Sequence, residues 1–198
     1  MSLLFETVCV KNGIPLHLAW HEKRMNFARQ EIWQISTPVI LESALVVPLE
    51  SATGVLRCNI HYGPEIQHVG FHAYEKNIIR SLKLINCPEI DYHLKYTDRE
   101  LLESLFALRG LCDEVIIVKN GHITDTTISN LIFFDGTDWF TPANPLLKGT
   151  CRNRLLATGR VIEKDIHVED INTFAGCKLI NAMRDPDEEM MIHVTEII

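Results

Sequence analysis

Apolar residues change their spacing several times along the chain, and each change marks a boundary between predicted strands and helices. FETVCV (5–10) and IPLHLAW (14–20) flank Asn12-Gly13, a dipeptide typical of a type I′ hairpin turn. From His21 onwards the apolar residues fit one face of a helix instead. That predicted face comprises Met25, Phe27, Ala28, Ile32 and Trp33.

The rest of the first half is rich in strand-forming patterns. The segment VLRCNIHYG (55–63) alternates as a half-buried strand does. HVGFHAY (68–74) and IIRSLKLI (78–85) continue the strand-rich composition up to Cys87-Pro88, which favours a turn. The pattern therefore predicts several short strands and one main helix before residue 88.

The second half begins with a predicted helix that has start and stop signals, TDRELLESLFALRG (97–110). Thr97 is expected to be its N-cap, with Glu100 three residues later completing a capping box. Gly110 supplies the residue that ends such a helix. A second, shorter helix is expected in GTCRNRLLATG (149–159), with Thr150 as its N-cap and Gly159 beyond its end.

Hairpins are expected between these two helices along the chain. EVIIVK and HIT meet at Asn120-Gly121, and LIFF and DWF meet at Asp135-Gly136. VIEKDI (161–166) and CKLINAM (177–183) are further expected strands. Because short hairpins outnumber helices, the pattern predicts an α+β fold rather than parallel βαβ units. We expect two domains, a smaller N-terminal one over residues 1–88 and a larger C-terminal one over residues 95–198.

Composition narrows the classes of partner. The chain has 198 residues, is 46% hydrophobic and carries a net charge of -7 in mixed-sign runs, so binding to nucleic acid or an anionic membrane is not expected. It contains no apolar run of the roughly 18–20 residues that a membrane span needs, and its start does not resemble a signal peptide. The six cysteines are scattered without a CxxC pair. A cytoplasmic protein with reduced thiols is the simplest interpretation.

Four positions have side chains or amides that can carry chemistry. Gly149-Thr150 opens a helix, where backbone N–H groups can bind a phosphate, although such a pair is more often only a cap. Arg24 can supply a second phosphate donor, or be an ordinary solvated arginine. Lys95, among aromatic and apolar neighbours, can act as a nucleophile or base, or extend to water. Asp125 can pair with a buried cation, or form a turn.

Two histidine pairs have a spacing that metal sites use. His17 and His21, and likewise His68 and His72, are four residues apart. That spacing aligns ligands on a helix, but both segments are expected to be largely strand or loop, and no third ligand is evident. No metal site is therefore expected from these pairs.

Taken together, Arg24, Lys95, Asp125 and Gly149-Thr150 require a ligand with a phosphate, an aldehyde and a basic ring nitrogen. Pyridoxal 5′-phosphate (PLP) has all three groups. The lysine would bond to the aldehyde, and the carboxylate would keep the ring nitrogen protonated so that the ring accepts electrons. This interpretation requires the four elements to converge in space.

The same residues resemble the class IV aminotransferases, the fold-type IV PLP enzymes, over nearly the whole chain. FETVCVKNGIPLHLAWHEKRM is similar to the family's opening F-E-T…G…H-x-x-R-[LM] segment, and LRCNIHYG to its second strand. LKYTDR is similar to the lysine segment. ITDTTISNLIFF, followed by TP and LLKGTCR, is similar to the cofactor segment. The resemblance implies two α+β domains, a homodimer and a small-molecule amine substrate.

Each matching position implies a role. Lys95 stands where the family has the lysine that bonds to the cofactor, and Arg24, Gly149 and Thr150 where it holds the phosphate. Ser129 and Asn130 match the family's Ser-Asn. The cofactor-binding set implied by the resemblance is Arg24, Lys95, Asp125, Ser129, Asn130, Gly149 and Thr150.

The chain departs from the family pattern at two places. Asp125 stands where the family usually has Glu facing the pyridine nitrogen, so its carboxylate reaches about 1.5 Å less far. The family normally also has a longer segment before F-E-T, including a D-R-G-type turn, whereas Phe5 lies almost at the start here. An N-terminally shortened member is therefore expected.

Three residues separate the activities found within the family. Arg99 lies four residues after Lys95, as in the K-x-x-N-R of 4-amino-4-deoxychorismate lyases, and one helical turn would place both on the same side. Asn181 and Arg184, in LINAMR, are similar to the lyases' N-[SA]-[LM]-R. All three are expected to bind substrate. The resemblance thus favours the lyase, which releases 4-aminobenzoate and pyruvate, over an amino acid transaminase or a non-catalytic PLP binder.

Overall fold

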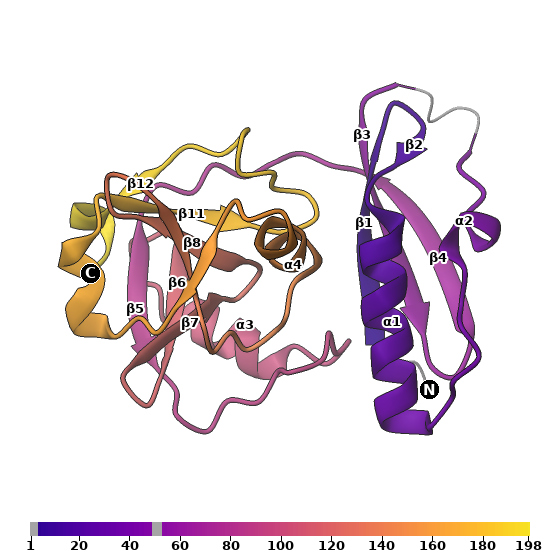
Figure 1. The fold of residues 1–198 in the computed structure, drawn as a ribbon, viewed down its shortest axis with the longest axis horizontal. Helices are drawn as coiled ribbons and strands as arrows, with labels where there is room; N and C mark the ends of the chain where they lie inside the picture. Colours follow the sequence, from indigo (N-terminus) through magenta and orange to yellow (C-terminus); the bar gives the residue numbers. More distant parts are fainter. Residues whose placement is uncertain (1–3, 49–52) are drawn as a thin grey trace. The chain divides into compact units, whose positions relative to one another are not determined.

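The computed structural model describes residues 4–48 and 53–198, which form two compact units (Figure 1). One unit comprises Met1–Lys76 and Leu94–Asp98, and the other comprises Asn77–His93 and Arg99–Ile198. The sequence placed residues 77–88 in the N-terminal domain. They belong to the second unit because the strand within them, β5 (Leu82–Asn86), pairs in parallel with β6 (Glu114–Lys119).

The first unit is an antiparallel sheet with a long helix along it. The strand order is β2-β1-β3-β4, and α1 (Leu18–Trp33) lies along one face of the sheet, with the short α2 (Leu41–Ala44) beside it (Figure 1). The four strands are β1 (Leu4–Lys11), β2 (Ile14–Pro15), β3 (Val55–Tyr62) and β4 (Ile66–Ala73). The strand predicted from alternation at 55–63 and the one predicted from strand-rich composition at 68–74 are confirmed.

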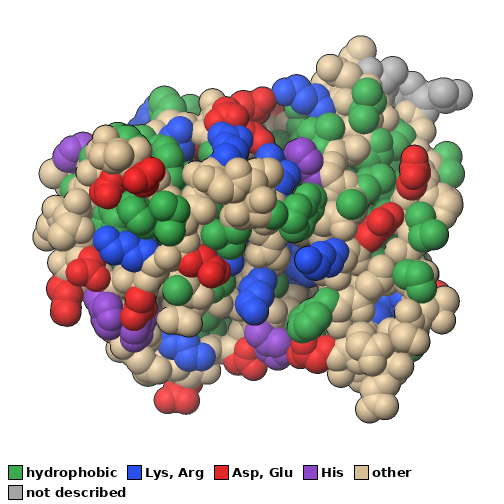
Figure 2. Space-filling model, viewed as in Figure 1, with side chains coloured by type: hydrophobic (Ala, Val, Ile, Leu, Met, Phe, Trp, Pro, Cys, Tyr) green, Lys and Arg blue, Asp and Glu red, His purple; other side chains and the backbone are tan. Residues whose placement is uncertain are grey.

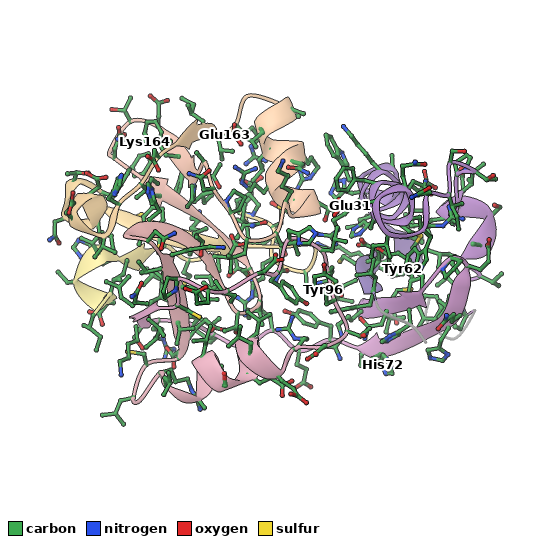
Figure 3. The ribbon with its side chains drawn as sticks, turned by 90° about the horizontal axis from the view of Figure 1, so that it is seen from below. Glu31, Tyr62, His72, Tyr96, Glu163 and Lys164 are labelled. Atoms are coloured by element: carbon green, nitrogen blue, oxygen red, sulfur yellow. The ribbon has the colours of Figure 1, made fainter. Side chains whose placement is uncertain are left out.

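The buried face of α1 differs from the predicted one. Met25 and Ala28 are buried as expected, and Tyr62 lies beneath the helix (Figure 3). Phe27, however, is 60% exposed, so the predicted apolar face is wrong at this position. The buried stripe continues through His21 and Arg29 instead. Polar residues can occupy it because both find hydrogen-bond partners inside the unit.

The second unit contains two sheets. One has the strand order β10-β9-β8-β11-β12 and the other β5-β6-β7. The remaining strands are β7 (His122–Thr126), β8 (Asn130–Phe134), β9 (Trp139–Pro142), β10 (Ile162–Lys164), β11 (Gly176–Ile180) and β12 (Ile192–His193). The helices are α3 (Glu100–Ala107) and α4 (Thr150–Ala157), with the 3-10 turns η2 (Val168–Thr173) and η3 (Val194–Glu196).

A single apolar cluster joins these two sheets. It draws residues from β5, β6 and β7 and from β8, β11 and β12, so both sheets share one core. Its largest members include Phe133, Phe174, Ile116 and Leu82, each at most 3% exposed. The mixture of hairpins, parallel pairs and separate helices confirms the α+β fold.

The helix starts differ from those predicted: α3 begins later, whereas α1 and α4 begin earlier. Arg99, not Thr97, is the N-cap of α3, and its carbonyl accepts the first intrahelical bond, from Glu103 N at 2.8 Å. By contrast, Gly149 is the N-cap of α4, so Thr150 is already the first helical residue and α4 begins one residue earlier than predicted. The predicted capping box at Thr97 and the Thr150 cap are therefore both wrong. Gly159 follows α4 with a φ of 67°, as expected of a terminating glycine.

Two of the three predicted hairpin turns have the expected backbone. Both residues of Asn12-Gly13 and of Asn120-Gly121 have positive φ, as a type I′ turn requires. At Asp135-Gly136 only the glycine has positive φ. Asp135 instead accepts hydrogen bonds from the N–H groups of Thr137 and Asp138, so this turn lies one residue later than predicted.

The charged side chains and the cysteines are distributed over the structure as follows. Figure 2 shows acidic and basic side chains interspersed over the visible face. All six cysteines are free thiols, and burial raises the pKa of Cys177 to about 12. Within the ranges that the structure describes, no helix is long and apolar enough to cross a bilayer.

Candidate functional site

Arg24 lies in a buried ionic cluster of the first unit. Its Nε donates to Oε1 of Glu6 over 2.8 Å and its Nη2 donates to Oε2 over 2.6 Å, a two-point fork. Nδ1 of His21 lies 2.7 Å from the same Oε2. Glu6 comes from β1, whereas Arg24 and His21 are one turn apart on α1. The cluster therefore fixes the arginine and ties the helix to the sheet.

Glu6 is ionised despite being fully buried. Burial alone would raise its pKa, but the charge of Arg24 and the hydrogen bonds from His21 and Arg24 outweigh burial and lower the pKa to about 2. Neither Glu6 nor His21 was expected to have a role in the site. The sequence did contain a sign of this cluster, because its residues come from the F-E-T and H-x-x-R motifs.

Lys95 lies in the segment Leu94–Asp98, which belongs to the first unit. Its carbonyl oxygen accepts a hydrogen bond from the Phe5 N–H at 3.0 Å, and the neighbouring Tyr96 forms a β-bridge with Leu4. Its Nζ lies 4.4 Å from the centre of the Phe5 ring. The aromatic surroundings that the sequence indicated for this lysine are thus found, and the F-E-T phenylalanine supplies them.

Asp125 is a buried acid on β7, with 4% of its surface exposed. Oδ1 accepts from Nδ2 of Asn130 at 2.7 Å, and Oδ2 accepts from the Leu147 N–H at 2.9 Å. Burial raises the pKa of Asp125 to about 6, and these hydrogen bonds, with the charge of Arg152, oppose that rise. The short carboxylate is therefore held by two donors in a place where an ionised acid needs a cation.

Asn130 connects this acid to the start of α4. The same Nδ2 that donates to Asp125 also donates to the Leu147 carbonyl, at 2.8 Å. Its Oδ1 lies only 1.9 Å from the place where a Cβ on residue 149 would stand, so Gly149 is the residue that fits here. Gly149 and Thr150 are both buried, and the first turn of α4 has N–H groups with no acceptor inside the helix.

Asn181 positions the loop that contains Ser129. Its Nδ2 donates to Ser129 Oγ at 2.9 Å and to the Ile128 carbonyl at 3.1 Å, while its Oδ1 accepts from the Met183 N–H at 2.8 Å. The predicted strand CKLINAM ends at Ile180, and 181–184 forms a tight turn. The structure thus links Asn181 to Ser129 across 52 residues of sequence.

Arg99 belongs to a polar network of the second unit. It donates to the Thr127 carbonyl at 2.8 Å and to the Tyr92 hydroxyl at 3.2 Å. The Thr127 hydroxyl in turn bonds to Glu114, a carboxyl whose pKa is raised because it is buried. Since α3 begins at Glu100, Lys95 and Arg99 do not share a helix face, and that part of the prediction is wrong.

Arg184 is almost completely buried, with 3% exposed. Its Nη1 donates to Glu189 at 2.9 Å and its Nη2 donates to the Asn77 carbonyl at 2.6 Å. These contacts link the C-terminal turn to the segment that opens the second unit. They enclose the guanidinium of Arg184 within the fold of the second unit.

Comparison with known proteins identifies the family to which the chain belongs. The sequence matches the family described as amino-transferase class IV over residues 3–186. The chain belongs to the class IV aminotransferase family. Members of this class are PLP-dependent enzymes, and the fold described above is the one they share.

Three relatives show how close the similarity is. An uncharacterized protein of Haemophilus influenzae is 41% identical over 92% of this chain and 98% of its own length. A crystal structure from Haemophilus somnus 129PT, of a protein provisionally described as a 4-amino-4-deoxychorismate lyase, has a TM-score of 0.89. It is 32% identical over 93% of this chain and 98% of that one. A hypothetical aminotransferase of Mycobacterium tuberculosis in its PLP-bound form has a TM-score of 0.77. At 15% identity, over 99% of this chain and 81% of that one, it shows the fold alone.

The residues of this member of the class IV aminotransferase family fit the groups that PLP presents. The second unit offers a buried acid to a ring nitrogen and the N-terminus of α4 to a phosphate. The first unit offers an arginine fixed by Glu6 and a lysine beside Phe5. The acid is the most specific of these features, because an ionised buried carboxylate without a cation is costly.

Proposed function

We propose that the protein is a PLP-dependent 4-amino-4-deoxychorismate lyase, which releases 4-aminobenzoate and pyruvate from its substrate. The observation that carries the proposal is the buried acid Asp125, held by Asn130 and the Leu147 N–H close to the start of α4. The choice of the lyase within the family is supported by the Haemophilus somnus relative. The Asn-Ala-Met-Arg turn at 181–184 also supports it, because its asparagine holds the Ser129 loop.

PLP, when bound, supplies an aldehyde and a ring that accepts electrons. Asp125 keeps a proton on the ring nitrogen, because a buried carboxylate favours a cationic partner over its own protonation. Its two hydrogen bonds keep its oxygens from rotating away. Asn130 and Ser129, themselves held by Leu147 and Asn181, keep this strand end in place.

The family resemblance implies phosphate-binding roles for Arg24 in the first unit and for Gly149 and Thr150 in the second. Glu6 restrains the Arg24 guanidinium at two points, so little conformational freedom is lost when the arginine binds an anion. Gly149 would let an anion approach the backbone, and the N–H groups of the first turn of α4 would bind it. The Thr150 hydroxyl is available as a further donor because Gly149, not Thr150, is the N-cap.

Lys95 has two roles in the proposal. Its amine would hold the cofactor at its aldehyde, and it would serve as the general base for the Cα proton of the substrate. The Phe5 ring beside Nζ shields the amine from water on one side. Arg99, oriented by Tyr92 and Thr127, is proposed to bind a substrate carboxylate. The family resemblance also supports a homodimer.

Product analysis tests this assignment. The purified protein, loaded with PLP, is incubated with aminodeoxychorismate, and the products are separated and identified. The proposal expects 4-aminobenzoate and pyruvate in equal amounts. Conversion of plain amino acids to keto acids, without these two products, would identify a transaminase instead. An absence of reaction with either substrate class would favour a PLP-binding protein without turnover.

A further inference from the structure

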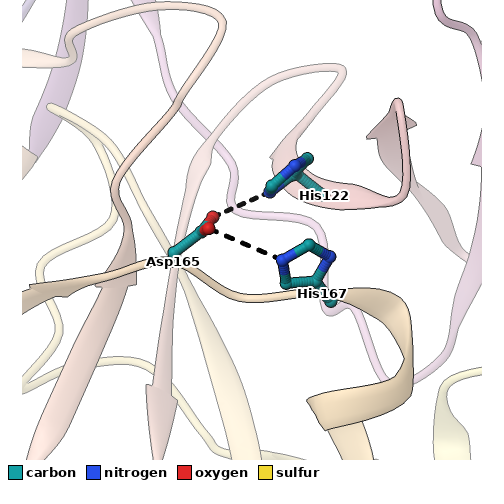
Figure 4. Close-up of side chains that lie close together, drawn as sticks. All are labelled: His122, Asp165 and His167. Atoms are coloured by element: carbon teal, nitrogen blue, oxygen red, sulfur yellow. Dashed lines mark hydrogen bonds and ion pairs between the residues drawn. The ribbon is translucent and has the colours of Figure 1, made fainter.

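Two histidines and an aspartate converge on the second unit, apart from the residues assigned to PLP. His122 Nδ1 lies 2.7 Å from Asp165 Oδ1, and His167 Nε2 lies 3.5 Å from Asp165 Oδ2 (Figure 4). The two imidazole rings are 4.1 Å apart between centres. One ligand atom from each of the three side chains can be chosen so that all lie within 4.8 Å of one another.

The backbone holds the three side chains together. His122 opens β7, immediately after the Asn120-Gly121 turn, and His167 is the N-cap of η2. The two histidines form an antiparallel β-bridge. Hydrogen bonds on both sides of them join the two segments, from Ile123 N to the Ile166 carbonyl at 2.8 Å and from Val168 N to the Gly121 carbonyl at 3.0 Å. The cluster is thus fixed by main-chain contacts.

We propose that His122, Asp165 and His167 bind a divalent transition-metal ion of the Zn²⁺ class. Two imidazoles and a carboxylate are a donor set that Zn²⁺ uses, with a water as the fourth ligand. Tetrahedral bonds of about 2.0–2.1 Å separate the ligand atoms by about 3.3 Å. The observed separations of 2.7 and 3.5 Å lie on either side of that value, so small rotations of the side chains suffice.

The position of the cluster allows an ion to enter and suggests what it does. The His122, Asp165 and His167 side chains are 30%, 55% and 39% exposed, respectively, so an aqueous ion can reach all three. Figure 2 shows histidine side chains beside acidic ones at the surface of the second unit. A bound ion would join the start of β7 to the segment that follows β10. It would therefore act as a structural clip rather than as part of the PLP chemistry.

This cluster does not follow the four-residue spacing of the histidine pairs that stand out in the sequence. His122 is 43 residues from its carboxylate partner. The only local signal is the Asp-x-His spacing of Asp165 and His167. The pairs that were considered lie elsewhere: His68 and His72 are both on β4, and His21 is bonded to Glu6.

Titration with Zn²⁺ tests the site. Untagged, full-length, PLP-loaded protein is titrated with zinc chloride in a calorimeter, and its melting temperature is measured with and without the metal. The proposal expects one equivalent bound per chain and a melting temperature raised by several degrees, because the ion binds the folded form. Exchange of Zn²⁺ for Co²⁺ should give a visible spectrum of a four-coordinate nitrogen and oxygen site.

Matched variants locate the binding. His122→Ala and Asp165→Asn should each weaken Zn²⁺ binding at least tenfold and remove the rise in melting temperature, with an unchanged circular dichroism spectrum. The control is His93→Ala, which removes an exposed histidine paired with Asp91 at 2.8 Å, a similar ion pair with no second imidazole in the cluster. Zn²⁺ binding that survives His122→Ala and Asp165→Asn, or an absence of saturable binding to the wild type, would overturn the proposal.

Discussion

Asn130 donates a hydrogen bond from Nδ2 to Oδ1 of Asp125 over 2.7 Å, and its own Oδ1 lies 1.9 Å from the position of a Cβ on residue 149. One amide side chain thus fixes the acid on β7 and requires glycine at the N-cap of α4. The two parts of the proposed cofactor site in the second unit depend on each other through this contact.

Gly149→Ala is predicted to weaken PLP binding by about tenfold to a hundredfold. The backbone at Gly149, with φ -62° and ψ 148°, accepts an alanine, so the obstacle is the Asn130 side chain alone. Displacing Asn130 breaks its bonds to Asp125 and Leu147, at a cost of about 1–3 kcal/mol. Titration of the apo protein with PLP, followed by absorbance, measures the effect.

A double-mutant cycle checks the cause of that loss. In an Asn130→Ala background the clash is absent, so adding Gly149→Ala should weaken PLP binding by less than twofold further. Equal effects of Gly149→Ala in both backgrounds would show that the glycine matters for another reason.

Asp125→Asn is predicted to slow turnover by about tenfold to a hundredfold while PLP still binds. An amide cannot pair ionically with a protonated ring nitrogen, and a charge-assisted bond is worth about 1.5–3 kcal/mol. Steady-state kinetics on PLP-saturated protein measure the change, with Asp138→Asn, at an exposed acid, as the control. An Asp125→Asn enzyme as fast as the wild type would show that this carboxylate does not keep the ring nitrogen protonated.

Glu6 is predicted to make stability fall steeply in acid. Its pKa of about 2 in the folded chain lies below the ordinary value of 4.5, so the ionised acid contributes stability above that ordinary value. The contribution, about 3 kcal/mol, is lost as the pH falls through about 2. Urea unfolding of the wild type between pH 5 and 2 should show this loss, and Glu6→Gln should show a shallower dependence.

At pH 7 the same substitution, Glu6→Gln, is predicted to lower the free energy of unfolding by about 3–5 kcal/mol, since it leaves the paired Arg24 and His21 without their carboxylate. The matched control is Glu65→Gln. Glu65 is 81% exposed and 3.7 Å from Arg29, so its loss should cost less than about 1 kcal/mol. Similar losses for the two variants would contradict the structural role assigned to Glu6.

Lys95→Ala is predicted to abolish the yellow colour of the PLP-loaded protein, an absorbance band expected at about 410–430 nm. The band depends on a covalent bond between a lysine and the cofactor. Lys83→Ala is the control and should keep the band, because Lys83 Nζ donates to the Leu108 carbonyl at 3.0 Å. Borohydride reduction followed by peptide mapping identifies the attached lysine, and an adduct at a lysine other than Lys95 would show the assignment to be wrong.

Most strands and two of the three hairpin turns were predictable from the sequence because they depend on local features. Alternation marked Val55–Tyr62, and the Asn-Gly pairs marked two turns whose backbone only a few residue types adopt. The buried face of α1 was not predictable in this way, because Phe27 lies on the exposed side whereas His21 and Arg29 are buried. Burial of these polar residues depends on partners such as Glu6, which no helical periodicity reveals.

The sequence motifs named the residues of the proposed site but not the contacts between them. The motifs indicated Asp125, Asn130 and Gly149, whereas the bonds from Asn130 to Asp125 and Leu147 depend on the tertiary fold. For Arg184 the role suggested by the motif and the observed contacts differ. Its motif suggested substrate binding, but the fold encloses it against Glu189.

The number of turnovers without a keto acid tests the central claim most directly. A lyase leaves the cofactor as the aldehyde after each cycle, whereas a transaminase must recover it from a keto acid. Purified PLP-loaded protein is mixed with excess aminodeoxychorismate alone, and pyruvate and 4-aminobenzoate are followed per chain. The account predicts many equivalents of both products with the visible band retained. A single equivalent of product, with loss of the band and recovery on adding 2-oxoglutarate, would contradict it.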